Sequence, residues 1–470
     1  MVKHYFLKIF SGVIISFGLF FSCKKIFEQN NYVAYFGGEV INPQSNEILF
    51  YKNGNVIDTI FLDKNNRFFH KFDSLAPGLY TFKNAPEYQY IYFEKNDSLM
   101  IRFNSLDFDN SLAFCGRGDE KNNFLIDLYL KNENDKSTFY KYVDADFNTF
   151  SKAIDSMYND RILEYNNHKK DVSWSDGFDS VAKASIDFNY FSRKEMYPII
   201  HQFKTNENIY EKLPKNYYDY RKNIDFNVTE FSNFSPFIKY TTAYLNNLSY
   251  VKSNFKRNDD NSLENNLFKL NCADSIFTNA INKNVVLNNI ALMYLFEEQN
   301  MYNNKQFISR YLALSTDEEK QKEIKEIVDA IQNLKIGNEL PEISLIDFKN
   351  NSTSLKNIIK NKKTVFFFWT TQAETHLLSV HTKIDNLRKK YPTINFIGIN
   401  LADSDEKWRK TITKNNFNRN FEFKATDFEQ IKNDWVITKV HRVIVVNPDE
   451  TIKNGFTNLY LPNFEKEILD

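Results

Sequence analysis

The feature of this sequence that most constrains the fold is the segment of residues 366–376, FFFWTTQAETH. An uninterrupted apolar run ends in Phe368 and Trp369, which is typical of a buried β-strand. Polar residues follow at once and predict the start of a helix. The residues between the strand and the helix therefore decide which chemistry this part of the chain can perform.

The segments on either side of this strand occur in the order and spacing of a known family. The matching runs are LPEISL at residues 340–345, SLKNI at residues 354–358 and VIVVNPD at residues 443–449. Together with the Phe-Trp strand, they resemble the membrane-anchored thiol-disulfide oxidoreductases of the TlpA and redoxin type. The resemblance covers about a quarter of the chain and implies a C-terminal α/β thioredoxin-like domain over residues 336–470.

The resemblance fails at the residues that carry the chemistry. In the family, a Cys-x-x-Cys follows the Phe-Trp strand at a helix N-terminus, and a cis-proline faces it. Ala373 and His376 occupy the two cysteine positions here, and His441 falls on the proline. A dithiol site needs one thiolate to attack a disulfide and a second thiol to resolve the intermediate. We therefore predict that the domain is redox-inactive, and we assign no catalytic residue to these degenerate positions.

If the thioredoxin-like fold is retained, the old active site becomes a candidate binding cleft. Its expected members are Trp369, Gln372, Glu374, His376 and His441. Imidazole and carboxylate groups can bind zinc, so His376, His441 and Glu374 are weak candidates for a metal site. Their spacing is not that of a tight ligand set, and we predict no metal and no other cofactor. Hydrolysis is disfavoured, since no acid is evident to orient His376.

The N-terminus indicates where the protein is located. Basic residues precede an apolar run at residues 9–21 that fits a signal peptide, so residues 1–22 are predicted to be removed. The run ends in Ser22-Cys23 and resembles a bacterial lipobox, which implies a lipid on Cys23 and a tether over residues 23–31. Lys24 is not the aspartate of inner-membrane retention, so we expect a cell-envelope protein on the outer membrane, facing the periplasm. An ordinary secretory signal and an uncleaved anchor are the alternatives.

The chain is predicted to be multidomain, because 470 residues are too many to fold around a single hydrophobic core. Short β-branched and aromatic runs separated by turn residues predict an antiparallel β-sandwich over residues 32–112. Helical periodicity predicts an all-α region over residues 113–335. The 60 basic and 60 acidic residues balance, which gives no support to nucleic-acid binding.

Two classes of function fit these observations. We favour a non-catalytic binding or scaffold lipoprotein, attached to the membrane through Cys23, with a protein partner in the cell envelope. The alternative is a thiol-disulfide oxidoreductase of the TlpA or redoxin type that uses non-standard residues, or Cys115 or Cys272 brought from another domain. Cys115 lies in a Gly-flanked segment that we interpret as a turn between domains, where a thiol can be exposed.

Overall fold

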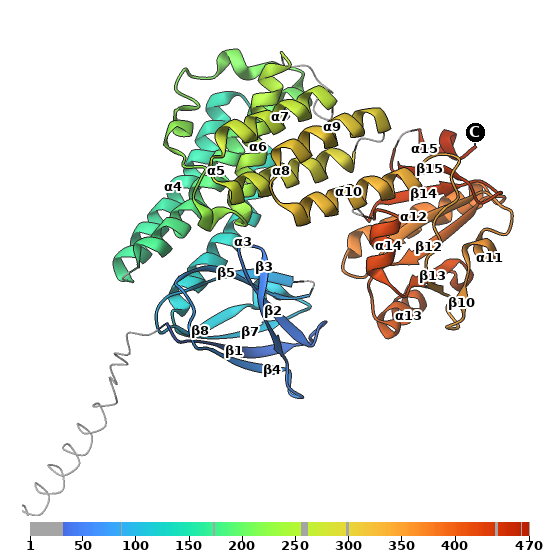
Figure 1. Cartoon of the computed structure of the whole chain (residues 1–470), viewed down its shortest axis with the longest axis horizontal. Coiled ribbons are helices and arrows are strands. Elements are labelled where there is room, and N and C mark those ends of the chain that lie inside the picture. The colour runs from blue at the N-terminus through green and yellow to red at the C-terminus, as the bar shows by residue number, and fades with distance from the viewer. Residues whose placement is uncertain are drawn as a thin grey trace, which may run out of the picture. The chain divides into compact units, whose positions relative to one another are not determined.

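The computed structural model describes residues 32–85, 87–172, 174–254, 262–297, 300–437, 440–461 and 463–469. The predicted signal peptide and tether, including Cys23, lie outside these residues. The chain forms two compact units, residues 1–224 with 228–244 and residues 225–227 with 245–470. The predicted fold class is confirmed: β-sheets come first, helices follow, and a mixed α/β domain ends the chain (Figure 1).

The N-terminal β domain consists of two four-stranded sheets with a common aromatic core. One sheet has the order β4-β1-β7-β8 and the other the order β3-β2-β5-β6. The strands are β1 (Ala34–Ile41), β2 (Glu47–Lys52), β3 (Asn55–Phe61), β4 (Arg67–Phe72), β5 (Gly78–Asn84), β6 (Glu87–Phe93), β7 (Ser98–Asn104) and β8 (Ala113–Arg117). Phe36 from the first sheet contacts Phe50 and Phe82 from the second, with ring centroids 5.7 and 5.6 Å apart. The sheets therefore pack face to face.

Two details of this domain differ from the sequence prediction. β1 and β7 pair in parallel, so the first sheet is mixed. The segment around Cys115 is not a turn but strand β8, which pairs with β7. The turn was predicted because of the flanking glycines. Gly116 adopts φ 106°, and a Cβ at this position would lie 2.1 Å from the Ser98 carbonyl oxygen. The glycine permits close pairing of two strands and does not mark a turn.

Asparagines form many of the turns. Asn53-Gly54 connects β2 to β3 with φ 52° and 85°, which is the left-handed pair that a two-residue hairpin requires. Asn42, Asn66 and Asn96 also have positive φ, between 52° and 61°. Asparagine tolerates this region because its side chain bonds the local backbone.

Helices form most of the described residues between 108 and 333, and β8 interrupts them after α2. In the first unit they are α2 (Phe108–Ser111), α3 (Asp119–Tyr142), α4 (Phe147–Asp171), α5 (Asp176–Thr205), η1 (Ile209–Lys212), η2 (Asp219–Asn223), η3 (Thr229–Phe231) and the start of α6 (Ser235–Lys252). In the second unit they are α7 (Leu263–Ile276), α8 (Ala280–Leu295), α9 (Met301–Leu314) and α10 (Glu318–Asn333). Side-chain caps such as Asp146 and Ser175 accept hydrogen bonds from the first-turn N–H groups. Across the described ranges, none of the helices has the length and apolar character needed to cross a bilayer.

The C-terminal domain has a seven-stranded sheet of order β10-β9-β13-β12-β11-β14-β15. Its elements are β9 (Leu345–Ile346), β10 (Ser352–Thr353), α11 (Leu355–Ile359), β11 (Thr364–Trp369), α12 (Glu374–Lys390), β12 (Asn395–Asn400), α13 (Asp405–Lys414), η4 (Arg419–Phe421), β13 (Glu422–Ala425), α14 (Phe428–Asp434), β14 (Arg442–Val446), β15 (Ile452–Asn458) and α15 (Phe464–Leu469). β11 pairs in parallel with β12 and antiparallel with β14.

The central strand β11 is buried on both faces. Val365, Phe367 and Trp369 belong to a core cluster with apolar residues of α12 and α15. The alternate residues Phe366 and Phe368 contact Trp435, which follows α14. Helices therefore cover both faces of the sheet, and the end of β11 leads directly to the start of α12.

Candidate functional site

The candidate site lies where β11 ends and α12 begins. Ala373 is the N-cap residue of α12, with φ −106° and ψ 63°, and offers no side-chain cap. A thiol at this position would lie at the positive end of the helix, where the thiolate is stabilised. A methyl group stands there instead, so the helix start keeps its geometry without its usual nucleophile.

Asp403 holds the loop that precedes α12. This carboxylate is 5% exposed and follows β12. It accepts hydrogen bonds from the Thr371 N–H at 2.8 Å, from the Thr371 hydroxyl at 2.5 Å and from the Asn400 amide at 2.6 Å. The Thr370 hydroxyl adds a longer bond of 3.4 Å. Because this one buried carboxylate accepts several hydrogen bonds, it holds the loop between β11 and α12 in place.

His376 connects α12 to the strand beneath it. Its ring is half-buried, and its Nε2 lies 3.1 Å from the Phe368 carbonyl oxygen, to which an Nε2–H donates. Burial lowers the pKa of His376, and the nearby charges of His441 and His381 lower it further. The imidazole is therefore neutral near pH 7, and one of its nitrogens is engaged in a structural bond.

This lowered pKa predicts a pH effect on stability. The unfolded chain protonates His376 first as the pH falls below the ordinary value of 6.5, so acidification favours the unfolded state. We expect the melting temperature of the wild-type chain to fall more steeply between pH 7.5 and pH 5 than that of His376→Gln. The exposed His168 on α4 supplies the control, and His168→Gln should follow the wild-type curve. Parallel curves for wild type and His376→Gln would contradict the assignment.

The other residues expected in the cleft differ in how exposed they are. Trp369 is fully buried, and its indole N–H donates to Glu422 at 2.9 Å, so it supports the site from within the core. Gln372 and His441 are exposed. The side chain of Glu374 lies outside the described part of the chain. Among the residues that are described, no group of three or more His, Cys, Asp or Glu side chains is placed to hold a metal ion.

A buried polar cluster lies behind Trp369. Glu422 on β13 is fully buried, and His381 on α12 is 3% exposed. The ring of His381 stacks on Phe417 with centroids 3.6 Å apart, its Nδ1 lies 2.7 Å from the Leu377 carbonyl oxygen, and its Nε2 lies 3.5 Å from Glu422. His381 thus packs α12 against Phe417 and places its ring close to the Glu422 carboxylate.

Sequence reasoning missed Asp403 and Glu422. A signal for Asp403 was present, because polar residues after parallel strands gather at the same edge of a sheet, and Asp403 comes three residues after β12 ends. Asp403 bonds the threonines of the loop, and no bond joins it to His376 among the residues described. Glu422 gives no such signal, since it lies in a short strand between apolar residues.

Both described cysteines are free thiols. Cys115 is exposed on β8, and Cys272 is half-buried on α7, where burial raises the pKa of its thiol. A raised pKa leaves less of the reactive thiolate near pH 7. Neither residue lies in the C-terminal domain.

Three comparisons with known proteins were informative to different degrees, and the match to a protein family bears on this domain. A family described as thioredoxin-like matches residues 361–452, which run from before β11 to the start of β15. The thioredoxin domain of a thiol-disulfide oxidoreductase from Bacteroides vulgatus is 22% identical over 29% of this chain and 99% of its own, with a TM-score of 0.25. A thiol-disulfide oxidoreductase from Bacteroides fragilis is 20% identical over 28% of this chain and 99% of its own, with a TM-score of 0.24. No curated protein matches the chain.

The family match, the sheet order and the strand-to-helix connection at Ala373 lead to the same assignment. The match spans too little of the chain to classify the whole protein. The C-terminal part of this protein is a thioredoxin-like domain.

Proposed function

We propose that this chain is a lipid-anchored cell-envelope protein whose thioredoxin-like domain binds a partner protein and does not exchange disulfides. The observation that carries the proposal is Ala373 at the N-cap of α12, in place of the attacking thiol. The cysteines of the chain are Cys23, Cys115 and Cys272, all outside residues 336–470. The domain thus keeps the fold and lacks both redox groups.

The surface around α12 supports a binding role. Gln372 and His441 are exposed, and Asp403 fixes the loop between β11 and α12. A fixed surface loses little conformational freedom when a partner docks, which favours binding. The partner is a protein of the cell envelope, and the anchor is a lipid on Cys23 that holds the chain on the outer membrane, facing the periplasm. The lipobox-like end of the N-terminal apolar run supports this location, and loss of fatty-acid labelling in Cys23→Ala tests it.

The redox part of the proposal is tested with a disulfide-exchange assay on the purified full-length chain. We expect the wild type to reduce insulin disulfides no faster than buffer with the same reductant. The double variant Ala373→Cys, His376→Cys should gain activity, because it restores a dithiol at a helix N-terminus. The control Leu378→Cys, Thr382→Cys places the same two thiols on the exposed side of α12 and should remain inactive.

Activity in the wild type would contradict this proposal. The alternative enzyme reading has one specific observation in its favour, the exposed thiol of Cys115. If wild-type activity is found and is lost in Cys115→Ser but not in Cys272→Ser, then the thiol on β8 is the active group and the protein is an oxidoreductase.

A further inference from the structure

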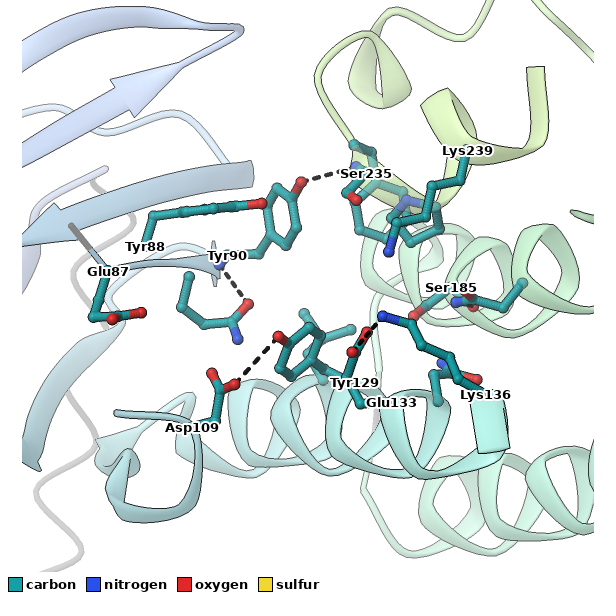
Figure 2. A pocket seen from close by; sticks show the side chains of 16 residues that line it. Glu87, Tyr88, Tyr90, Asp109, Tyr129, Glu133, Lys136, Ser185, Ser235 and Lys239 are labelled. Carbon is teal, nitrogen blue, oxygen red and sulfur yellow. Dashed lines mark hydrogen bonds and ion pairs between the residues drawn. The ribbon is translucent and has the colours of Figure 1, made fainter. Parts of the chain in front are cut away.

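The first unit contains a cavity that none of the features above explains. Its volume is about 350 Å³, within the range of small-molecule sites. β6 and α2 line one side, and α3, α5 and the start of α6 line the other (Figure 2). Aromatic rings form part of the wall, and buried amide and hydroxyl side chains of Gln89, Asn132 and Ser185 face it. This combination of apolar wall and few polar groups is typical of a ligand site.

One end of the cavity carries two carboxylates without a cation. Glu87 on β6 and Asp109 on α2 are half-buried, and neither forms an ion pair within the described residues. Within the described ranges, the Asp109 carboxylate accepts a single hydrogen bond, from the Tyr129 hydroxyl at 3.3 Å. Burial raises the pKa of both carboxyls, and the charge of Asp109 raises that of Glu87 further. A bound cation would relieve this repulsion.

The opposite end carries a lysine without a carboxylate. Lys239 on α6 reaches toward the cavity from the side facing Glu87 and Asp109 (Figure 2). It has no ion pair among the residues described, whereas its neighbour Lys136 is bonded to Glu133. Burial and the charge of Lys136 lower the pKa of Lys239 by more than the charge of Glu133 raises it, so an anion at this end would be stabilised.

Hydrogen bonds and ring packing hold the wall between the two ends. The Tyr90 hydroxyl accepts a hydrogen bond from the Ser235 N–H at 2.8 Å and donates one to the Asn233 carbonyl oxygen at 3.1 Å. The Tyr90 ring packs against Phe234 with centroids 5.2 Å apart. The backbone N–H of Tyr90 donates to the Gln89 side-chain oxygen at 2.7 Å, which leaves the Gln89 amide nitrogen as a donor at the wall.

We propose that this cavity binds a small zwitterion of the amino-acid and short-peptide class, with its ammonium group at Glu87 and Asp109 and its carboxylate at Lys239. The carboxylates and the lysine lie at opposite ends of the cavity, so the cavity favours a ligand that carries a positive and a negative charge. The amide and hydroxyl groups of Gln89, Asn132 and Ser185 suit a peptide backbone, and Tyr90 and Phe234 suit an apolar side chain. The site lies in a different unit from the thioredoxin-like domain, so this proposal does not depend on the redox proposal.

The test is saturation-transfer NMR and calorimetry on the full-length chain with a library of Ala-Xaa-Ala tripeptides. We expect binding by members of the library, and at least a tenfold loss when the best tripeptide is N-acetylated or C-amidated. Asp109→Asn and Lys239→Gln should each weaken binding at least tenfold. Asp127→Asn and Lys152→Gln remove the same charges at exposed positions outside the cavity and should bind like the wild type.

Three outcomes would overturn the assignment. These are no binding by any tripeptide, equal binding of blocked and free peptides, and unchanged affinity in both cavity variants. Binding of neutral oligosaccharides without peptide binding would assign the cavity to another class of ligand. If Asp109→Asn fails to fold, as judged by its circular dichroism, Glu87→Gln provides the second carboxylate variant.

Discussion

Replacing Glu195 with alanine is expected to lower the free energy of unfolding of the first unit by about 3–5 kcal/mol. Glu195 is fully buried on α5 and accepts hydrogen bonds from the Tyr220 hydroxyl at 2.6 Å and from Arg221 Nε at 2.8 Å, with a further bond to Arg221 Nη2. Arg221 is itself mostly buried, and its guanidinium lies 3.8 Å from the centroid of the Tyr218 ring. Without the carboxylate, a buried guanidinium loses its charge partner, and the cost of that unpaired charge dominates.

Urea denaturation followed by circular dichroism measures this effect, and hydrogen exchange of α5 and η2 assigns it to the first unit. Glu211→Ala removes an exposed carboxylate from the nearby η1 and should change stability by less than about 0.5 kcal/mol. Glu195→Gln should fall between alanine and wild type because an amide still accepts hydrogen bonds. A loss of less than about 1 kcal/mol in the free energy of unfolding for Glu195→Ala would contradict the expectation that an unpaired Arg221 destabilises the first unit.

Replacing Asp403 with alanine is expected to destabilise the thioredoxin-like domain by about 2–4 kcal/mol, because the half-buried donors of Thr371 and the buried amide of Asn400 lose their acceptor. The loop between β11 and α12 should become mobile at the same time. The Thr371 amide reports this directly, since its hydrogen exchange is expected to accelerate far more than that of the central strand β11.

The matched control is Glu406→Ala, which removes an exposed carboxylate three residues away on α13. It should leave the Thr371 exchange rate and the stability of the domain unchanged. If Asp403→Ala lowers stability but leaves Thr371 protected, the carboxylate supports the core in general and does not order the loop. Unchanged stability would contradict the buried-acceptor argument itself.

The sequence predicted elements well where one local signal was strong. β11 ends at Trp369 as predicted, because the apolar run stops there and polar residues follow. The turn between β2 and β3 lies at Asn53-Gly54, a dipeptide that favours a left-handed two-residue hairpin. β8 was missed because its glycines indicated a turn, although Gly116 serves close strand pairing.

Site residues were harder to predict, because they depend on contacts between distant positions. Asp403 follows the loop only after an intervening helix and strand, so no pattern near His376 in the sequence indicates it. The zwitterion cavity could not be predicted at all. Glu87 and Lys239 are about 150 positions apart, and only the packing of β6 against the helices of the first unit brings them to one cavity.

The asparagine turns have a consequence for the chain before it folds. The protein has 12 glycines in 470 residues, yet asparagine takes positive φ at nine described positions. These are Asn42, Asn53, Asn66, Asn96, Asn206, Asn254, Asn350, Asn361 and Asn416. An asparagine samples fewer backbone conformations than a glycine, so less entropy is lost when such a turn becomes ordered. Each of these asparagines thus lowers the conformational entropy of the unfolded chain. This contribution to stability does not come from any contact in the folded protein.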